Sequence, residues 1–292
     1  MKVTGFTFIR NAFIYDYPVV EAIKSILPLC NEFVVAVGLS NDDTLQLIKQ
    51  IDPKIRIIET IWDDSLREGG RTLAIETNKA LAAISPDTDW AFYIQGDEVF
   101  HEQYTQTVKD SMLKYKDEPD IDGLLFNYIH FYGSYNYVGA SSNWYRNEIR
   151  IIKIGRSIYS YRDAQGFRKD NNKKLNVILI DAYIYHYGWI KDPKAMQRKQ
   201  ESFHKMYHDD KWVDNNVIKA DEFDYGKHVQ VLNLLTGTHP EVMQNRILNK
   251  NWKFDFDITR NKLPLKDKTK RFLKTYLGID LGYKNYKQIN FY

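Results

Sequence analysis

The sequence lacks most of the features that mark specialised protein classes. One cysteine, Cys30, stands among 292 residues, so an internal disulfide and a cysteine-based zinc cluster are both excluded. We expect this thiol to act as a small buried apolar group. No apolar run approaches the ~20 residues that a membrane-spanning helix needs. The first apolar run is too short for a signal peptide and is broken by Arg10 and Asn11, which favours a cytoplasmic protein.

An excess of charge of one sign is missing too. The chain has 41 basic residues (Lys and Arg) against 38 acidic ones, a net charge of +3. Nucleic-acid-binding proteins usually show a concentrated basic field, so we expect no nucleic-acid partner.

Several motifs of common enzyme classes are absent. Residues 9–12 read Ile-Arg-Asn-Ala, where a dinucleotide-binding chain would carry Gly-x-Gly-x-x-Gly after its first strand. The chain also has no Gly-Lys-Ser/Thr phosphate loop, no Gly-x-Ser-x-Gly elbow and no His-Glu-x-x-His. These absences argue against a hydride-transferring dehydrogenase, a P-loop ATPase and a serine hydrolase.

What the first part of the chain does contain is an alternation of strand-like and helix-like segments. Short β-branched or aromatic runs predict strands, and apolar residues at helical spacing predict the helices between them. We expect strands at residues 5–9, 33–37, 55–59 and 90–94, and helices at residues 17–26, 44–50 and 71–84. This order predicts an α/β fold with a mostly parallel central sheet.

The second part of the chain departs from this alternation. We expect helices at residues 104–115 and 193–208, strands at residues 123–131, 146–154 and 177–187, and a polar loop at residues 162–174. From residue 237 the composition becomes basic and aromatic, which predicts a small helical appendage. The predicted organisation is therefore a main domain, residues 1–236, and a C-terminal appendage, residues 237–292.

An acidic turn follows the fourth expected strand. Residues 90–94 are apolar or aromatic, and after Gln95 and Gly96 come Asp97 and Glu98. Ligands of open α/β sheets bind just beyond the carboxyl ends of the strands. The two carboxylates are therefore placed where hard oxygen ligands hold a divalent cation against a phosphate.

Five segments, in this order and at these spacings, carry a resemblance to a known family. They are Phe-Ile-Arg-Asn at 8–11, Val-Gly-Leu-Ser-Asn-Asp-Asp-Thr at 37–44, the stretch that opens Gly-Gly-Arg at 69–78, Gln-Gly-Asp-Glu at 95–98, and Tyr-His-Tyr-Gly-Trp at 185–189. The set resembles family 2 glycosyltransferases with the GT-A fold, and within them a bacterial subgroup whose acidic turn reads Gln-x-Asp-Glu. The resemblance covers residues 1–210.

The sequence departs from the family pattern at two places. Gln95 replaces the first aspartate of Asp-x-Asp, which removes one charge from the expected metal site. Val37 and Gly38 stand where an acid often reads the uracil base, which leaves the base of the nucleotide open.

The resemblance implies a nucleotide-sugar-binding sandwich, a nucleoside-diphosphate sugar as donor, and Mn²⁺ or Mg²⁺ as cofactor. Within it, Asp97 and His186 are the expected metal ligands, since carboxylate and imidazole both suit Mn²⁺. The residues expected at the donor are Arg10, Asn11, Arg71, Gln95 and Asp97.

An inverting transferase also needs a base that takes the proton of the acceptor hydroxyl. We favour Asp163, in the polar loop, over Glu148, which precedes an apolar strand and has Arg146 and Arg150 as nearby partners. Glu98 is assigned the orientation of the acceptor hydroxyl, with capping of the next helix as its alternative.

The function predicted in this way is metal-dependent, inverting sugar transfer to a glycan or lipid-linked acceptor in polysaccharide biosynthesis. Two alternatives remain: a sugar nucleotidyltransferase, although residues 10–13 do not supply its glycine-rich basic loop, and a degenerate fold that only binds glycan. Residues 265–277 have one cationic and one apolar face, which fits either a docked helix or peripheral contact with the inner face of a membrane.

Overall fold

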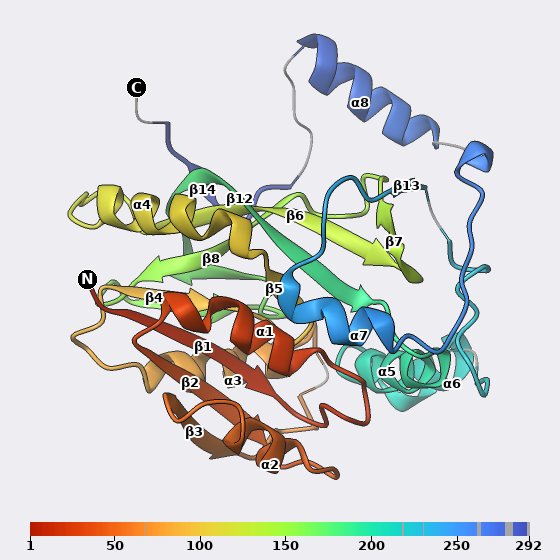
Figure 1. Ribbon diagram of the computed structural model, residues 1–292, viewed down its shortest axis with the longest axis horizontal. Coiled ribbons are helices and arrows are strands. Elements are labelled where there is room, and N and C mark those ends of the chain that lie inside the picture. The colour runs from red at the N-terminus through yellow and green to blue at the C-terminus, as the bar shows by residue number, and fades with distance from the viewer. Residues whose placement is uncertain (67, 218, 230, 262–263, 278–282, 291–292) are drawn as a thin grey trace.

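Four parallel strands made from β-branched and aromatic runs form one half of the central sheet. They are β1 (Val3–Ile9), β2 (Glu32–Gly38), β3 (Ile55–Thr60) and β4 (Trp90–Tyr93), in the spatial order β3-β2-β1-β4. The computed structural model describes residues 1–292 except 67, 218, 230, 262–263, 278–282 and 291–292 (Figure 1). Because the four strands are parallel, their carboxyl ends meet at one edge of the sheet.

The other half of the sheet is mixed. From β4 the order continues through antiparallel β8 and β6 to β7 and β13, while β12 runs parallel to β6 and antiparallel to β5. The bounds are β5 (Glu98–Phe100), β6 (Gly123–Tyr132), β7 (Ser134–Gly139), β8 (Asn147–Lys153), β12 (Asn176–Trp189), β13 (Leu232–Leu234) and β14 (Lys287–Gln288), the last pairing with β12.

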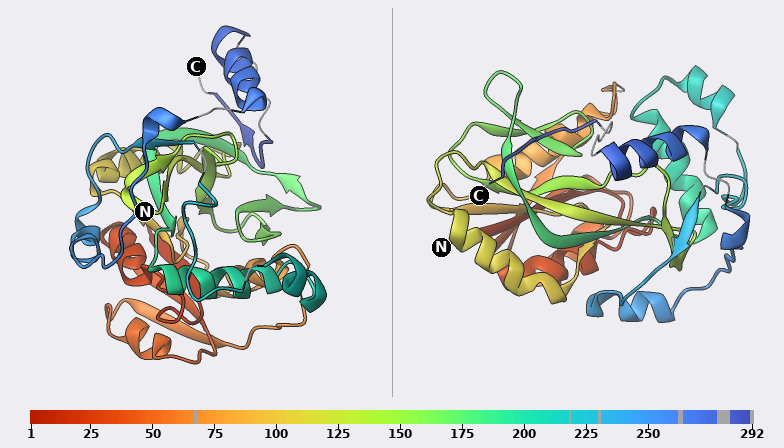
Figure 2. Two further views of the ribbon diagram at one scale, coloured as in Figure 1. Left: turned by 90° about the vertical axis from the view of Figure 1, so that its right-hand side faces the viewer. Right: turned by 90° about the horizontal axis from the view of Figure 1, so that it is seen from above.

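Helices cover both faces of the sheet, as the views of Figures 1 and 2 show. One face packs against α1 (Val19–Ile26), α2 (Thr44–Lys49) and α4 (Thr105–Tyr115). The other packs against α3 (Arg71–Ala82) and a small sheet of β9 (Ile158–Tyr161), β10 (Gly166–Lys169) and β11 (Lys173–Lys174). Short 3-10 turns are η1 (Leu27–Leu29), η2 (Glu102–Tyr104), η3 (Glu241–Met243) and η4 (Ile258–Arg260).

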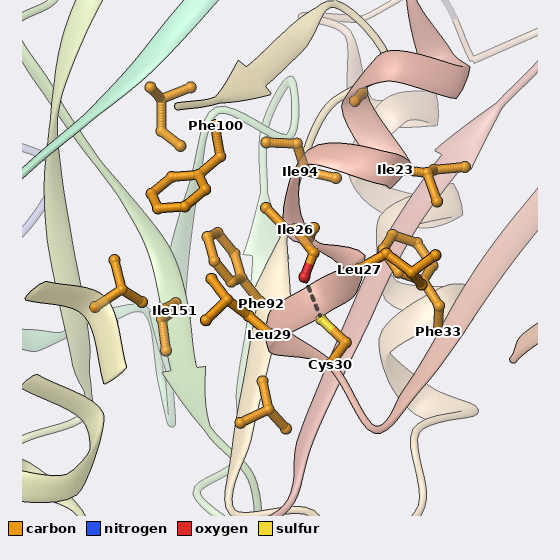
Figure 3. Close-up of a cluster of buried hydrophobic side chains, with 14 of the residues drawn as sticks. Ile23, Ile26, Leu27, Leu29, Cys30, Phe33, Phe92, Ile94, Phe100 and Ile151 are labelled. Atoms are coloured by element: carbon orange, nitrogen blue, oxygen red, sulfur yellow. Dashed lines mark hydrogen bonds between the residues drawn. The ribbon is translucent and has the colours of Figure 1, made fainter. Parts of the chain in front are cut away.

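The core under α1 contains the single cysteine (Figure 3). Cys30 is buried and donates a hydrogen bond of 3.2 Å to the carbonyl of Ile26, beside Phe33 and Phe92. Burial raises the pKa of this thiol to about 12. The prediction that Cys30 is a small buried group of the core is therefore confirmed.

The predicted α/β class is confirmed, and the expected strands and helices lie within a few residues of their observed bounds. The segment expected to be a loop, residues 162–174, instead contains β10 and β11. Buried Phe167 joins the core beneath α3, and Arg168 lies over the ring of Tyr161 at 4.5 Å. These tertiary contacts stabilise a β-hairpin in a segment whose polar composition predicts a loop.

Two further helices lie at the edge where β1 and β12 end (Figure 1). They are α5 (Pro193–Lys205) and α6 (Asp210–Asn216). Asp192 caps α5 by accepting hydrogen bonds from the amides of Lys194 and Ala195, with Pro193 in the first turn. This start places the polar face of α5 over the carboxyl edge of the sheet.

Contacts of the C-terminal residues cross the predicted boundary after residue 236. Arg246 in α7 (Gln244–Leu248) forms ion pairs with Asp16 and Glu21 beside α1, and β14 extends β12. The helix α8 (Leu265–Leu277) contacts the main body where Asp267 accepts a hydrogen bond from the hydroxyl of Ser142. None of the described helices combines the length and apolar character needed to cross a membrane.

The Arg246 ion pairs test whether the C-terminal residues are part of the folded unit. We expect Arg246→Gln to lower stability by about 1 kcal/mol, which corresponds to a fall of ~2–4 °C in Tm, because Asp16 and Glu21 lose their shared cation. Thermal unfolding followed by circular dichroism measures it, with the exposed Lys109→Gln on α4 as control. An unchanged Tm would indicate a separable appendage.

Candidate functional site

A pocket of about 390 Å³ opens where the parallel strands end, and we call it the Asp97 pocket. Its floor is the turn after β4, including Gln95 and Asp97, and its walls include Arg10 from the end of β1 and Lys199 from α5. The sequence-predicted residues Arg10, Gln95, Asp97, Asp163 and His186 all line this pocket. The structure thus brings together residues that are up to 176 positions apart in the chain.

Asp97 and His186 meet because β5 pairs with β12. In this antiparallel pairing His186 lies opposite Glu98, and the amide of Tyr187 donates to the carbonyl of Asp97 at 2.8 Å. The carboxylate Oδ2 of Asp97 lies 3.7 Å from Nε2 of His186. Gly188 leaves room for this approach, since a Cβ there would lie 2.6 Å from Nε2 and 2.7 Å from Oδ2.

A second histidine fixes the tautomer of His186. Nε2 of His130 lies 2.7 Å from the carbonyl of Tyr145, which only accepts, so this nitrogen carries the proton. Burial lowers the pKa of both histidines, so both rings are neutral at pH 7. Nδ1 of His130 is then an acceptor for Nδ1 of His186 at 3.1 Å. His186 therefore presents the lone pair of Nε2 to the carboxylate of Asp97.

Cations surround the Asp97 carboxylate. Nζ of Lys199 lies 3.1 Å from Oδ2 of Asp97 and 3.0 Å from the carbonyl of Gly188. Lys191 is fully buried behind it, donates to the carbonyl of Asp16 and lies 4.3 Å from the centre of the Tyr17 ring. Burial alone would raise the pKa of Asp97, but Lys199, with Lys191 beyond it, holds that pKa well below its usual range.

The donor set formed by Asp97 and His186 fits a divalent cation in part. A carboxylate oxygen and an imidazole lone pair converge across a gap that only glycine at 188 leaves open, and both groups suit Mn²⁺. Within the described part of the chain, no three or more acidic, histidine or cysteine side chains are grouped to hold a metal. The remaining ligands would therefore come from a bound substrate and water, in competition with Lys199 for the same oxygen.

Glu98 lies in the interior and does not line the Asp97 pocket. Both its carboxylate oxygens are bonded to Arg150, at 2.8 Å to Nε and 2.7 Å to an Nη, and both residues are fully buried. Tyr128 donates to the same carboxylate at 2.8 Å, as does the amide of Gln95 at 3.1 Å. This geometry corresponds to a positioning residue and leaves the predicted contact with an acceptor hydroxyl without support.

Two residues expected at the donor, Asn11 and Arg71, do not line the Asp97 pocket. Asn11 is buried with a φ of 55°, and its side chain accepts from the amide of Asn41 at 2.8 Å, so it braces the turn after β1. Arg71 begins α3 and lines a different, larger pocket. Gln95 does line the Asp97 pocket, and its side-chain amide donates a hydrogen bond of 3.2 Å to the carbonyl of Ala164.

The larger pocket has a volume of about 1180 Å³, and we call it the Glu148 pocket. It adjoins the Asp97 pocket, because Tyr145, Asp163, Gln165 and Tyr207 line both. The carboxylate of Asp163 accepts from the hydroxyl of Tyr207 at 3.4 Å. Asp163 thus lies at the junction of the two pockets.

Glu148 lies in the wall of the pocket that carries its name and is 4% exposed. Burial raises its pKa to about 8, opposed by Arg150 and Arg168 and reinforced by Glu98 and Asp163. Its Oε2 has no hydrogen-bond partner among the described residues. Glu148 is therefore a neutral carboxylic acid at pH 7.

Sequence reasoning missed four residues that shape the site: His130, Arg150, Trp62 and Lys199. Trp62 lines the Asp97 pocket, with Arg10 at 4.5 Å from its ring centre and Phe8 packed beside it. His130 and Arg150 stand among apolar residues of β6 and β8, and those residues predict only that the strands are buried. Lys199 is one of several basic residues on the polar helix α5. No local signal distinguishes them, because their roles depend on partners distant in sequence.

No protein-family model and no curated protein matches this sequence. Among solved structures the chain is similar to TarS of S. aureus, at 15% identity and a TM-score of 0.40, over 69% of this chain and 38% of that one. A TarS structure in complex with UDP aligns at 12% identity and a TM-score of 0.42, over 76% and 68% of the two chains. Glucosyl-3-phosphoglycerate synthase from Mycobacterium tuberculosis, with Mn²⁺, UDP and phosphoglyceric acid, aligns at 20% and 0.29, over 44% and 43%. Likenesses of this size assign no function to the chain.

The raised pKa of Glu148 predicts how stability depends on pH. Unfolded glutamate ionises near 4.5, whereas Glu148 in the folded chain keeps its proton up to about 8. The folded state then binds more protons, so this residue lowers stability as pH rises from 4.5 to 8. We expect Glu148→Gln to gain stability relative to wild type across this window, by up to ~1.4 kcal/mol per pH unit.

Denaturant unfolding at several pH values between 4.5 and 9 measures this difference. Glu59→Gln, at an exposed position of β3, is the matched control. A constant difference between Glu148→Gln and wild type at every pH would contradict the neutral state of Glu148.

The gap beside Gly188 predicts the effect of one methyl group. We expect Gly188→Ala to weaken Mn²⁺ binding in the presence of nucleoside diphosphate by at least ~10-fold, because its Cβ enters the space between Asp97 and His186. Electron paramagnetic resonance of free Mn²⁺ measures the affinity. Gly226→Ala, in an exposed turn where the Cβ meets nothing closer than 3.3 Å, should bind as wild type does. Equal Mn²⁺ affinities of the two variants would show that the metal does not bind in the gap between Asp97 and His186.

Proposed function

We propose that the protein is a metal-dependent, inverting glycosyltransferase. It moves a sugar from a nucleoside-diphosphate donor to a glycan or lipid-linked acceptor. The observation that carries the proposal is the meeting of Asp97 with the lone pair of His186 in one pocket, with Asp163 at the passage to a second pocket. The resemblance of the ordered motifs to family 2 glycosyltransferases supports the same assignment.

The Asp97 pocket has the groups that a nucleotide donor needs. Trp62 and Phe8 offer aromatic surface for a base or sugar, and Arg10 carries a guanidinium that suits phosphate oxygens. Lys199 adds a second cation beside Asp97. Arg10 is held by an ion pair with Asp64 at 2.9 Å, on the rim of the pocket.

Asp97 and His186 would hold the divalent cation. Such a cation, when bound, stabilises the negative charge that develops on the departing diphosphate. The ammonium of Lys199 lies 3.1 Å from Asp97, so its positive charge would also stabilise a diphosphate that leaves beside Asp97. His130 keeps the lone pair of His186 directed at the site throughout.

Asp163 is the proposed base. The acceptor oxygen forms a bond to the anomeric carbon on the face opposite the leaving group, and the bond from that carbon to the phosphate oxygen breaks. The proton of the acceptor hydroxyl passes to the carboxylate of Asp163, and the electron pair of the broken bond leaves with the diphosphate. The position of Asp163 at the boundary of both pockets supports this role.

A second candidate function is glycan binding without catalysis. It is favoured by the ion pair between Lys199 and Asp97, which places an ammonium where a metal would bind. The two functions differ in their response to Mn²⁺, because a binding protein needs none for its glycan. Contact of residues 265–277 with a membrane stays a prediction beside both.

The Asp97 carboxylate provides the direct test. We expect Asp97→Asn to lower nucleoside-diphosphate release by at least ~100-fold, since the change removes the charge that faces the cation and keeps the shape of the side chain. Release from a panel of UDP-, GDP- and ADP-sugars is measured with and without Mn²⁺. Asp110→Asn, on the exposed side of α4, is the control and should release at the wild-type rate.

Two results would overturn the proposal. Full turnover of Asp97→Asn, in a variant that melts as wild type does, would put the reaction elsewhere. Glycan binding by wild-type protein, with no Mn²⁺-dependent binding of any nucleoside diphosphate, would favour the second candidate.

A further inference from the structure

Buried polar atoms without partners gather at the two pockets. In the described part of the chain, five buried side-chain atoms lack a hydrogen bond: Trp62 Nε1, Trp144 Nε1, Glu148 Oε2, Ser160 Oγ and Asn285 Oδ1. Four of them belong to residues that line the Glu148 pocket, and the fifth belongs to Trp62 at the Asp97 pocket. Nearly all buried polar groups in folded proteins are paired, so unpaired groups in a pocket wall are candidates for contact with a ligand. The two indole N–H groups are not, because Trp62 packs its Nε1 against Gly38 and Trp144 packs its Nε1 against Gly139.

The same pocket is rich in positive charge. Arg71, Arg146, Arg162, Lys270 and Lys284 line it, and within the described residues none of the five forms an ion pair with an acid. Against these five basic residues the lining has three acids, Glu68, Glu148 and Asp163.

Glu148 does not reduce this positive charge. Its carboxyl stays protonated at pH 7, because burial raises its pKa to about 8. The protonated group can donate a hydrogen bond, as can the hydroxyl of Ser160. Donors in the wall and cations around it are the arrangement that anionic oxygens require.

We propose that the Glu148 pocket binds a polyhydroxylated acceptor that carries negative charge, that is, a glycan bearing phosphate or carboxylate groups. The unpaired donors of the wall take its hydroxyl and anionic oxygens, and the cations balance its charge. Rings of Trp144, Tyr159 and Tyr161 supply flat apolar surface for the sugars between the charged groups.

The C-terminal residues complete this pocket. Lys270 from α8 and Lys284 and Asn285 ahead of β14 form part of its wall. The wall is anchored, since the carbonyl of Asn285 accepts from Arg168 at 2.7 Å and the amide of Lys287 donates to Leu175 at 2.8 Å. The selection of an anionic acceptor therefore depends on residues beyond position 237.

That the bound glycan is the acceptor of the sugar rests on the proposed function, whereas the binding of an anionic glycan does not. The test measures binding alone, by calorimetry at about 50 mM salt to limit screening. The probes are neutral maltotetraose, the same sugar carrying a 6-phosphate, and tetragalacturonate, so that phosphate and carboxylate are distinguished. We expect at least one anionic probe to bind ~10-fold or more tightly than maltotetraose.

The double variant Arg146→Gln, Lys284→Gln should lose this preference and keep the affinity for maltotetraose. Its matched control is Lys109→Gln, Lys114→Gln, which removes two exposed lysines from α4 and should retain the preference. Equal binding of neutral and anionic probes, a preference that survives the Arg146 and Lys284 changes, or equally tight binding of oligouridylate would each overturn the proposal. UDP binding to the same proteins separates the two proposals: anionic glycan binding without any nucleotide binding refutes only the proposed function.

Discussion

The buried ion pair between Glu98 and Arg150 holds the candidate site together. Glu98 also accepts from the amide of Gln95, in the turn that carries Asp97, while Arg150 donates to the carbonyl of Gln165 at 3.0 Å, in the loop that carries Asp163. One pair of charges thus fixes two segments that are far apart in the chain. Burying both charges has a desolvation cost that offsets much of their attraction, so the main effect of the pair is to fix the positions of these segments. Loss of one partner would leave an uncompensated buried charge.

The two adjacent carboxylates of the acidic turn consequently have opposite roles. Side chains of neighbouring residues point to opposite sides of a strand, and β5 begins at Glu98. Glu98 therefore enters the interior, and Asp97, one residue earlier, faces the pocket. The pairing of β5 with β12 then brings His186 beside Asp97. The sequence places two acids at a strand end, but only the strand register decides which of them meets solvent.

The first four strands and the helices between them could be predicted from the sequence, because burial on both faces leaves apolar runs that local patterns reveal. The hairpin of β10 and β11 could not, since its polar residues are ordered by Phe167 in the core and by Arg168 over Tyr161. Asp97 and His186 were predicted from motif order and Asp163 from its place in a polar loop, and all three line the Asp97 pocket. Lys199 was not, because its partner lies 102 residues away and nothing around it in α5 marks it.

The loop of Asp163 shows how the fold holds a functional side chain in place. Arg162 and Ala164, on either side of Asp163, have φ values of 56° and 62°, in the left-handed region that non-glycine residues rarely adopt. Such backbone persists only where the surroundings over-determine it. Here Ala164 is fully buried, its carbonyl accepts from Gln95, and the next carbonyl accepts from Arg150. Because these contacts do not involve the carboxylate of Asp163, that group is left at the junction of the two pockets with its position set by its neighbours.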